Sequence, residues 1–500
     1  MTGKVWLVGA GPSDEGLLTV KGKEILQKAQ VVVYDRLVGA GILSLIPEKA
    51  EVIDVGKRAG NHTMSQEKIN QLLLKKAKEG KAVVRLKGGD PFLFGRGGEE
   101  LELLVEQNIP FEVVPGVTSA ISVPAYNGIP VTHRDCTSSL HIITGHKRQG
   151  EKLELDYEAL VRLSGTLVFL MGVSALSDIC QGLINVGMKK DMPAAVLQQG
   201  TTARQKKIIA TVSALPQEVK KQGIETPAII VVGKVCVLGN SLEWYEKKPL
   251  FGKRILVTRP KERSGTLCGK LRDAGAEVVE MPTIKTVPKL KNRKSEEVFS
   301  NLKEYQYLVF TSPAGVKIFF DMLRQRNMDI RSIGAASLAA IGAGTKKELE
   351  EHGLICDLMP EIYDGEHLGI LLGEKVREEE KILIPRAAEG SMQLIQEIEK
   401  RSKAQITDLP IYETVYETAR FVPEDIDMAV FTSASTVRGF IKAAAHLDIS
   451  KIQAVCIGKQ TEAAAKELGM QTMTARKATI DSLVECCINE RYMNAENSSY

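Results

Sequence analysis

VVRLKGGDPFLFGRGGEE occupies residues 83–100, where an apolar, β-branched run leads directly into a turn crowded with glycine. Val83 and Val84 predict the end of a buried strand, and residues 88–91 predict the turn that ends it. Ligands of open α/β sheets bind just beyond the carboxyl ends of strands. A structural turn needs one or two glycines, whereas this stretch holds Gly88, Gly89, Gly95, Gly97 and Gly98. We therefore predict a site at which a ligand approaches bare backbone closely.

Length and composition set the class of protein. A chain of 500 residues is too long for one core and predicts several domains. Its net charge of +4 does not favour a nucleic-acid partner, and no apolar run predicts a membrane span or a signal peptide. The eight cysteines show no CxxC spacing, so we expect no metal site and a reducing, cytoplasmic location.

Apolar runs alternate with helical segments throughout the first half, which predicts an α/β fold. The expected strands are residues 5–9, 31–34, 52–55, 83–86, 111–114, 140–144, 166–171, 194–197 and 228–237. A new strand at 254–257 follows the basic stretch before Pro249, so we place a linker at residues 246–252.

The second half of the chain repeats itself. Four pairs of segments recur in the same order, namely 255–260 with 382–387, 282–287 with 410–415, 310–316 with 431–437, and 341–345 with 457–461. A period this long excludes a solenoid and predicts a duplicated α/β unit with two similar lobes. Clefts between lobes commonly hold ligands.

The first strand is followed by Val8-Gly-Ala-Gly-Pro-Ser-Asp14, in which Asp14 replaces the third glycine of GxGxxG. A pyrophosphate is thus poorly supported, and a nucleoside cofactor without phosphates fits better. Thr118, Ser119 and Gly200 could hold it, although turns and helix caps are the favoured explanation for each of them taken alone. An anionic small molecule would explain the basic residues near strand ends, which include Arg36, Lys57, Arg58, Arg85, Lys87, Arg96 and Arg134.

Residues 3–245 resemble one family closely. The motifs that carry the resemblance are 33–38 (VYDRLV), 56–60 (GKRAG), 84–92, 95–100, 115–119 and 128–134. They are similar to those of uroporphyrinogen-III C-methyltransferase. The resemblance implies a dimeric, two-domain tetrapyrrole-methylase fold. It also implies that the half uses S-adenosyl-L-methionine to methylate uroporphyrinogen III twice, giving precorrin-2.

The resemblance also implies roles for individual residues. Asp35 matches the family's proton acceptor and Lys57 its proton donor, while a salt-bridged, purely structural Asp35 remains the alternative. The cofactor contacts fall on Pro12, Gly88, Gly89, Asp90, Leu93, Thr118, Ser119, Met171 and Gly200. The carboxylates of the tetrapyrrole would account for Arg36, Arg58, Arg96 and Arg134. Ser13 departs from the glycine usual in the family, and we expect it to cost some backbone freedom.

Residues 251–488 resemble uroporphyrinogen-III synthase through their Thr-Ser strand ends, their Ile-Gly turns and Leu409–Thr414. The resemblance implies cyclisation of hydroxymethylbilane with inversion of the last pyrrole. It implies discontinuous lobes, 253–284 with 417–488 and 285–416, followed by a flexible tail at 489–500. Tyr412 would assist departure of hydroxide, unless it is an ordinary strand tyrosine with a surface hydroxyl. Thr311, Ser312, Thr345, Thr432, Ser433 and Thr461 would line the cleft, although each could be a helix cap.

Two other functions stay open. The methyltransferase could act on a later precorrin, or the second half could be a non-catalytic tetrapyrrole-binding module. The sequence also leaves open whether the product feeds sirohaem or cobalamin.

Overall fold

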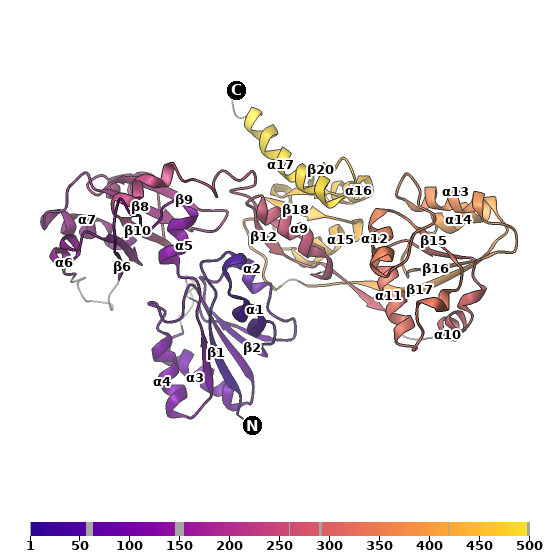
Figure 1. Cartoon of the computed structure of the whole chain (residues 1–500), viewed down its shortest axis with the longest axis horizontal. Coiled ribbons are helices and arrows are strands. Elements are labelled where there is room, and N and C mark those ends of the chain that lie inside the picture. The colour runs from indigo at the N-terminus through magenta and orange to yellow at the C-terminus, as the bar shows by residue number, and fades with distance from the viewer. Residues whose placement is uncertain are drawn as a thin grey trace. The chain divides into compact units, whose positions relative to one another are not determined.

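A computed structural model of the chain describes residues 2–56, 64–145, 155–259, 261–289, 293–418 and 420–497. The chain divides into two compact units. The first holds residues 1–282 and 419–500, and the second holds residues 283–418. The described residues form four five-stranded sheets, each with helices packed on it (Figure 1).

The first sheet is wholly parallel, in the order β3-β2-β4-β1-β5. Its strands are β1 (Lys4–Gly9), β2 (Val31–Tyr34), β3 (Glu51–Asp54), β4 (Ala82–Lys87) and β5 (Phe111–Val114). The helices between them are η1 (Glu15–Leu17), α1 (Val20–Leu26), α2 (Ala40–Leu43), α3 (Gln66–Lys78) and α4 (Gly97–Glu106). The strands are rich in valine because both faces are buried. Val5, Val33 and Val83 pack toward α3 and α4, whereas Val8 and Val84 pack toward α1 and α2.

The second sheet is mixed, in the order β6-β7-β10-β8-β9. Its strands are β6 (Leu140–Thr144), β7 (Thr166–Leu170), β8 (Pro193–Gln198), β9 (Lys206–Thr211) and β10 (Ala228–Val232). Its helices are α5 (Ser119–Tyr126), α6 (Tyr157–Arg162), η2 (Val173–Ala175), α7 (Leu176–Asn185), α8 (Leu215–Lys221) and η3 (Lys234–Asn240). The strand predicted at 228–237 is too long, because Gly233 adopts a φ of +151° and the residues after it form η3, in which Val235 and Cys236 are buried.

The third sheet, in the order β12-β11-β18-β19-β20, is parallel throughout. Its strands are β11 (Arg254–Val257), β12 (Glu277–Glu280), β18 (Met428–Phe431), β19 (Gln453–Cys456) and β20 (Gln471–Thr474). Its helices are α9 (Lys261–Asp273), α15 (Ala434–Ala443), η6 (Ile449–Lys451), α16 (Lys459–Glu467) and α17 (Ile480–Asn497). The tail predicted to be flexible from residue 489 is therefore helical as far as Asn497.

The fourth sheet, in the order β13-β17-β16-β14-β15, makes up the second unit. Its strands are β13 (Ile284–Pro288), β14 (Tyr307–Phe310), β15 (Ser337–Ala340), β16 (Lys381–Ala387) and β17 (Gln405–Tyr416). Its helices are α10 (Arg293–Ser300), η4 (Leu302–Glu304), α11 (Pro313–Arg324), η5 (Ile330–Ile333), α12 (Ala343–Glu351), α13 (Gly365–Lys375) and α14 (Gln393–Arg401).

The third and fourth sheets confirm the internal duplication. Three of the four repeated pairs lie in or directly after strands at equivalent places, since β11-β18-β19 in one sheet corresponds to β16-β14-β15 in the other. The segments of the remaining pair, 282–287 and 410–415, lie in β13 and β17, which are neighbours in the fourth sheet. Each repeated Thr-Ser follows a strand and precedes a helix, α11 in one sheet and α15 in the other. Ser312 and Ser433 are both extended N-cap residues, with φ of −164° and −166°.

Candidate active sites

Glycines at or just after the carboxyl ends of β1, β4 and β5 meet at one edge of the first sheet. A Cβ on Gly9 would lie 2.5 Å from the Gly116 Cα, and a Cβ on Gly116 would lie 2.2 Å from the Gly89 carbonyl oxygen. Gly11 and Gly89 exchange backbone hydrogen bonds of 3.1 and 2.8 Å across this point. Only residues without side chains permit this close approach of the loops after β1, β4 and β5.

Gly89 itself faces open space. It has a φ of +67°, and a Cβ built on it would meet no atom within 4 Å. A Cβ on Gly98 would also meet no atom within 4 Å, but Gly98 lies inside α4, whereas Gly88, Gly95 and Gly97 pack within the chain. A Cβ on Gly88 would lie 2.6 Å from the Leu37 Cβ. On Gly95 and Gly97 it would lie 2.6 and 2.5 Å from the Pro91 carbonyl oxygen. The bare backbone predicted for ligand approach is therefore centred on Gly89.

Asp90 shapes the loop with its carboxylate. Its Oδ1 accepts hydrogen bonds from the amides of Phe92 (2.8 Å) and Leu93 (3.1 Å), and its Oδ2 accepts one from Gly116 (3.0 Å). The side chain is thus occupied in joining the loops after β4 and β5.

The loops of the second sheet reach the same place. Thr201 donates a hydrogen bond of 2.7 Å from its hydroxyl to the Pro12 carbonyl, which brings the predicted residues Pro12 and Gly200 together. Thr118 is the N-cap of α5, and its hydroxyl accepts a hydrogen bond from the Ala120 amide. The alternative prediction that Thr118 caps a helix is therefore confirmed. Ser119 begins that helix.

Unfavourable backbone conformations gather in these loops. Ten non-glycine residues of the described ranges have a positive φ. Six of them lie in the loops around Gly89, in the loop of Pro12, or next to predicted Met171 and Gly200: Ser13, Phe94, Arg96, Met171, Gln199 and Thr201. Each costs of order 1–3 kcal/mol and persists where surrounding structure imposes it, which is typical of ligand sites.

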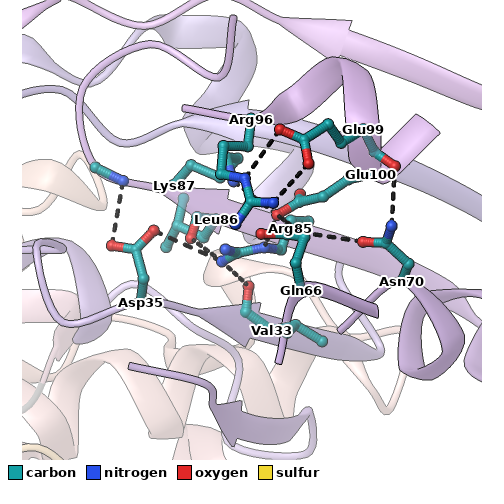
Figure 2. Close-up of polar contacts among 11 residues, drawn as sticks. Val33, Asp35, Gln66, Asn70, Arg85, Leu86, Lys87, Arg96, Glu99 and Glu100 are labelled. Atoms are coloured by element: carbon teal, nitrogen blue, oxygen red, sulfur yellow. Dashed lines mark hydrogen bonds and ion pairs between the residues drawn. The ribbon is translucent and has the colours of Figure 1, made fainter. Parts of the chain in front are cut away.

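Asp35 lies at the end of β2, beside this cradle. Its Oδ1 accepts hydrogen bonds from the amides of Leu37 (3.1 Å) and Gly88 (3.4 Å), and its Oδ2 lies 3.7 Å from Nη1 of Arg85. About a quarter of the side chain is exposed (26%), so it can reach a bound molecule while its orientation is fixed (Figure 2). The salt bridge weighed as an alternative for Asp35 is present.

The basic residues predicted to bind an anion separate into groups. Arg36 and Arg134 are exposed. Arg96 pairs with Glu99 through hydrogen bonds of 2.9 and 2.6 Å, which raise the pKa of Arg96. Lys57 and Arg58, predicted as proton donor and carboxylate ligand, lie outside the described residues.

Arg85 and Lys87, two of the basic residues near strand ends, are buried. Both contact Glu100, a residue that the sequence reasoning missed. The missed signal is helical periodicity. Glu100 lies on the buried stripe of α4 with Gly97, Leu101 and Leu104, and a carboxylate on an apolar stripe predicts a buried ion pair.

In the second unit, Tyr412 contacts a predicted cleft residue. Its hydroxyl lies 2.7 Å from the Ser312 hydroxyl, and the side chain is buried. The alternative of a surface hydroxyl on Tyr412 is therefore wrong. Ser312 also caps α11, accepting a hydrogen bond of 3.0 Å from the Gly315 amide. Thr311 is half-buried beside it, and Thr345 is buried in α12.

In the first unit, the repeated positions are again helix starts. Ser433 accepts a hydrogen bond of 3.3 Å from the Thr436 amide and contacts Ser435. Thr432 is half-buried, and Thr461 is buried in α16. The cap alternative thus holds for Ser312 and Ser433, whereas Tyr412 adds a phenol for which the first unit has no counterpart.

Among the described residues, no group of three or more His, Cys, Asp and Glu side chains could hold a metal ion. No helix in the described ranges is long and apolar enough to cross a membrane.

Comparison with known families assigns a class to each half. Residues 4–216 match the family model of tetrapyrrole (corrin/porphyrin) methylases, and residues 265–485 match that of uroporphyrinogen-III synthase HemD. The two halves therefore define a tetrapyrrole methylase joined to a uroporphyrinogen-III synthase.

Two relatives of similar length and one that matches the first half alone identify the family. The chain is 51% identical to the porphyrin biosynthesis protein HemD of Ruminiclostridium josui over 97% of both chains. It is 43% identical to a uroporphyrinogen-III C-methyltransferase of Bacillus subtilis over 71% of this chain and 72% of the relative. An S-adenosyl-L-methionine-dependent uroporphyrinogen III methyltransferase of Methanosarcina barkeri is 52% identical over 48% of this chain and 94% of its own. The chain belongs to this family of fused tetrapyrrole biosynthesis proteins.

Proposed function

We propose that this chain catalyses two consecutive steps of tetrapyrrole biosynthesis. The second half cyclises hydroxymethylbilane to uroporphyrinogen III with inversion of the last pyrrole. The first half methylates that product twice to precorrin-2. The observation that carries the methyltransferase assignment is the open backbone cradle at Gly89 with the fixed Asp35 carboxylate beside it.

The cradle fits S-adenosyl-L-methionine. A nucleoside without phosphates is held by backbone groups and hydroxyls, and the loops of Pro12, Gly89, Thr118, Met171 and Gly200 offer these. When bound, the molecule supplies an electrophilic methyl group. We assign the binding residues as Pro12, Gly88, Gly89, Asp90, Leu93, Thr118, Ser119, Met171 and Gly200, with Asp90 acting through its hold on the loop.

Asp35 is the base in this proposal. Carbon methylation of a pyrrole requires loss of a proton, and a carboxylate at hydrogen-bond reach of substrate takes it efficiently. Two backbone amides orient the Asp35 carboxylate while leaving part of it exposed. Lys57 would return a proton, and the acetate and propionate groups of the substrate would meet Arg36, Arg58, Arg96 and Arg134.

For the synthase half we assign Tyr412 as the group that assists departure of hydroxide. When the Ser312 hydroxyl donates its hydrogen bond to the Tyr412 oxygen, the Tyr412 hydroxyl is free to donate its own proton to a leaving oxygen. Thr311, Thr345, Thr432, Ser433 and Thr461 would orient the linear substrate. The remaining task is positioning, because inversion competes with direct ring closure.

The chain is further proposed to work as a homodimer through its methyltransferase half in the cytoplasm, without a metal. All eight cysteines are free thiols, which suits a reducing compartment. Sedimentation of the purified chain tests the dimer, and chelator treatment with unchanged turnover tests the absence of a metal.

The decisive experiment gives the full chain hydroxymethylbilane and S-adenosyl-L-methionine and follows precorrin-2. Formation of only the uninverted ring isomer at the spontaneous rate would leave the second half as a non-catalytic binding module. Feeding uroporphyrinogen III directly tests the first half alone. Failure to methylate it, with turnover of a later precorrin, would reassign the substrate.

Substitution of the two assigned residues separates the two activities. Asp35→Asn should bind S-adenosylhomocysteine normally and lose at least about 100-fold in kcat for methylation, the usual contribution of a general base. Its synthase activity should be unchanged. Tyr412→Phe should slow cyclisation and leave methylation of added uroporphyrinogen III unchanged. Full methylation by the Asp35→Asn chain would remove Asp35 from the mechanism.

A further inference from the structure

A buried cluster of charges lies beside Asp35 (Figure 2). Arg85 and Lys87 lie two residues apart on β4, and strand geometry points both toward α4. They are only 4% and 5% exposed, and Glu100 on α4 is fully buried. The Glu100 Oε1 lies 2.7 Å from Lys87 Nζ and 3.3 Å from Arg85 Nε, and it also accepts a hydrogen bond of 3.1 Å from Gln66.

The glycine-rich loop brings Glu100 to this position. Gly97 begins α4 against the Pro91 carbonyl, at a distance that a side chain would prevent. Arg96, just before the helix, adopts the left-handed conformation with a φ of 57°. Together these residues start the helix close enough to β4 for a glutamate in its first turns to contact the strand.

The cluster holds one more cation than anions. Arg85 and Lys87 are opposed within it by Glu100, and the remaining positive charge faces Asp35 through the 3.7 Å contact of Arg85. Burial and the neighbouring Arg85 lower the pKa of Lys87, while Glu100 counteracts them. Arg85 is held further by the carbonyls of Val33 and Leu86, at 3.4 and 3.1 Å from Nη1.

Stability does not explain these charges. Buried ions lose their hydration, and well-packed apolar residues in their place are often neutral or stabilising. The same face of β4 is apolar at Val83, where it packs on Leu101 and Leu104. The charges occupy only the carboxyl end of the strand, where the site lies.

We propose that Arg85 is a positioning residue that holds Asp35 oriented and ionised, and that the Lys87–Glu100 pair fixes Arg85 in place. This inference rests on the proposed role of Asp35 as the base. The positive charge of Arg85 lies 3.7 Å from the Asp35 carboxylate and stabilises its negative charge before methyl transfer. After Asp35 accepts the proton, the cluster keeps one uncompensated positive charge, which favours release of that proton to solvent through the exposed part of the side chain.

Among the described residues, two further charged groups lie next to Asp35 in the chain or on the neighbouring strand. Arg36 follows it in the chain and is exposed. Asp54 ends the neighbouring strand β3, and its carboxylate accepts from the Gly56 amide. Because these groups stay the same in the variants below, a change in pH dependence reports on the cluster.

The test is the pH profile of kcat for methylation of uroporphyrinogen III by the full chain. Arg85→Met removes the cation and leaves Lys87 and Glu100 as a neutral pair. We expect the acid limb to move to higher pH by about one unit, since an opposite charge at this distance favours ionisation of a carboxylate by that order. Arg85→Lys, which restores the charge, should bring the limb back toward its original position.

A matched variant separates electrostatics from structural damage. Lys87→Met combined with Glu100→Gln removes one cation and one anion, so the charge beside Asp35 is kept. Its acid limb should stay in place whatever happens to the plateau of kcat. Glu102→Gln removes an exposed carboxylate from the same helix and serves as the control. Thermal unfolding and calorimetric binding of S-adenosylhomocysteine show whether each variant folds.

A second readout needs no turnover. In chains labelled with ¹³Cγ-aspartate, the resonance lost in Asp35→Asn identifies Asp35, and its titration should move to higher pH in Arg85→Met. If Arg85→Met fails to fold, Arg85→Gln takes its place with the same expectation. An acid limb and an Asp35 titration that coincide with those of the unmodified chain would overturn the proposal for Arg85. Full turnover by Asp35→Asn would instead overturn the proposed role of Asp35 as general base, on which the proposal for Arg85 rests.

Discussion

Ser13 has a φ of 110°, a conformation that L-residues with side chains rarely adopt. The sequence predicted a cost at this position, and the structure confirms it. We expect Ser13→Gly to stabilise the first unit by about 1 kcal/mol, because relief of 1–3 kcal/mol of backbone strain exceeds the entropy that glycine adds to the unfolded chain. Chemical denaturation measures the gain. Ser13→Ala keeps the Cβ and serves as the control, so an equal gain from alanine would contradict the explanation.

At the scale of residues, the sequence predicts which side chains carry the chemistry better than it predicts which side chains are buried. Asp35, Gly89 and Tyr412 could be selected from motifs because each follows or lies in a recognisable strand. The environment of Arg85 could not be predicted, since its partners come from α4 and from the end of β2. Contacts between segments depend on how closely a helix packs on a sheet, which residue order alone does not specify.

The start of α4 offers a matched pair of glycines at the scale of an element. A Cβ on Gly97 would lie 2.5 Å from the Pro91 carbonyl oxygen and 2.9 Å from the Phe92 ring, whereas one on Gly98 would meet nothing within 4 Å. We expect Gly97→Ala to destabilise the first unit by about 1–3 kcal/mol through overpacking. Gly98→Ala should stabilise it by up to about 1 kcal/mol through helix propensity.

Thermal unfolding of the two alanine variants measures both effects. Because Gly97 sets the distance between Glu100 and β4, Gly97→Ala should also weaken binding of S-adenosylhomocysteine through displacement of the loop from Pro91 to Arg96. Equal melting temperatures for the two variants would mean that α4 can shift without cost.

Strands show why some elements were missed. The valine runs of β1, β2 and β4 are buried on both faces and were predicted directly. β9 begins with two lysines and was not predicted. Lys207 is nevertheless almost buried in this edge strand, where it pairs with Glu243 and Glu246 at 2.8 and 2.9 Å. Partners more than thirty residues away make the charge acceptable there.

At the scale of the whole molecule, the chain joins two enzyme halves, and the second half contains an internal duplication. The duplication of the synthase half was visible in four short motifs, because strand ends and helix starts carry the residues that the fold requires. The sequence did not show the exact division into two units, which are residues 1–282 with 419–500 and residues 283–418. The division depends on which sheet each end of a connecting segment joins.

This division predicts how the chain unfolds. The unit of residues 283–418 has its own core, in which Phe299, Phe310, Phe319 and Phe320 are packed ring against ring. Calorimetry should therefore resolve at least two transitions. S-adenosylhomocysteine at 100 times its Kd should stabilise only the unit that binds it, by about 2.7 kcal/mol. Phe319→Ala, which empties a fully buried position, should lower only the other transition, by about 3–5 kcal/mol. If the ligand raised both midpoints equally, the two units would unfold as one, and closure of the synthase would be coupled energetically to the methyltransferase site.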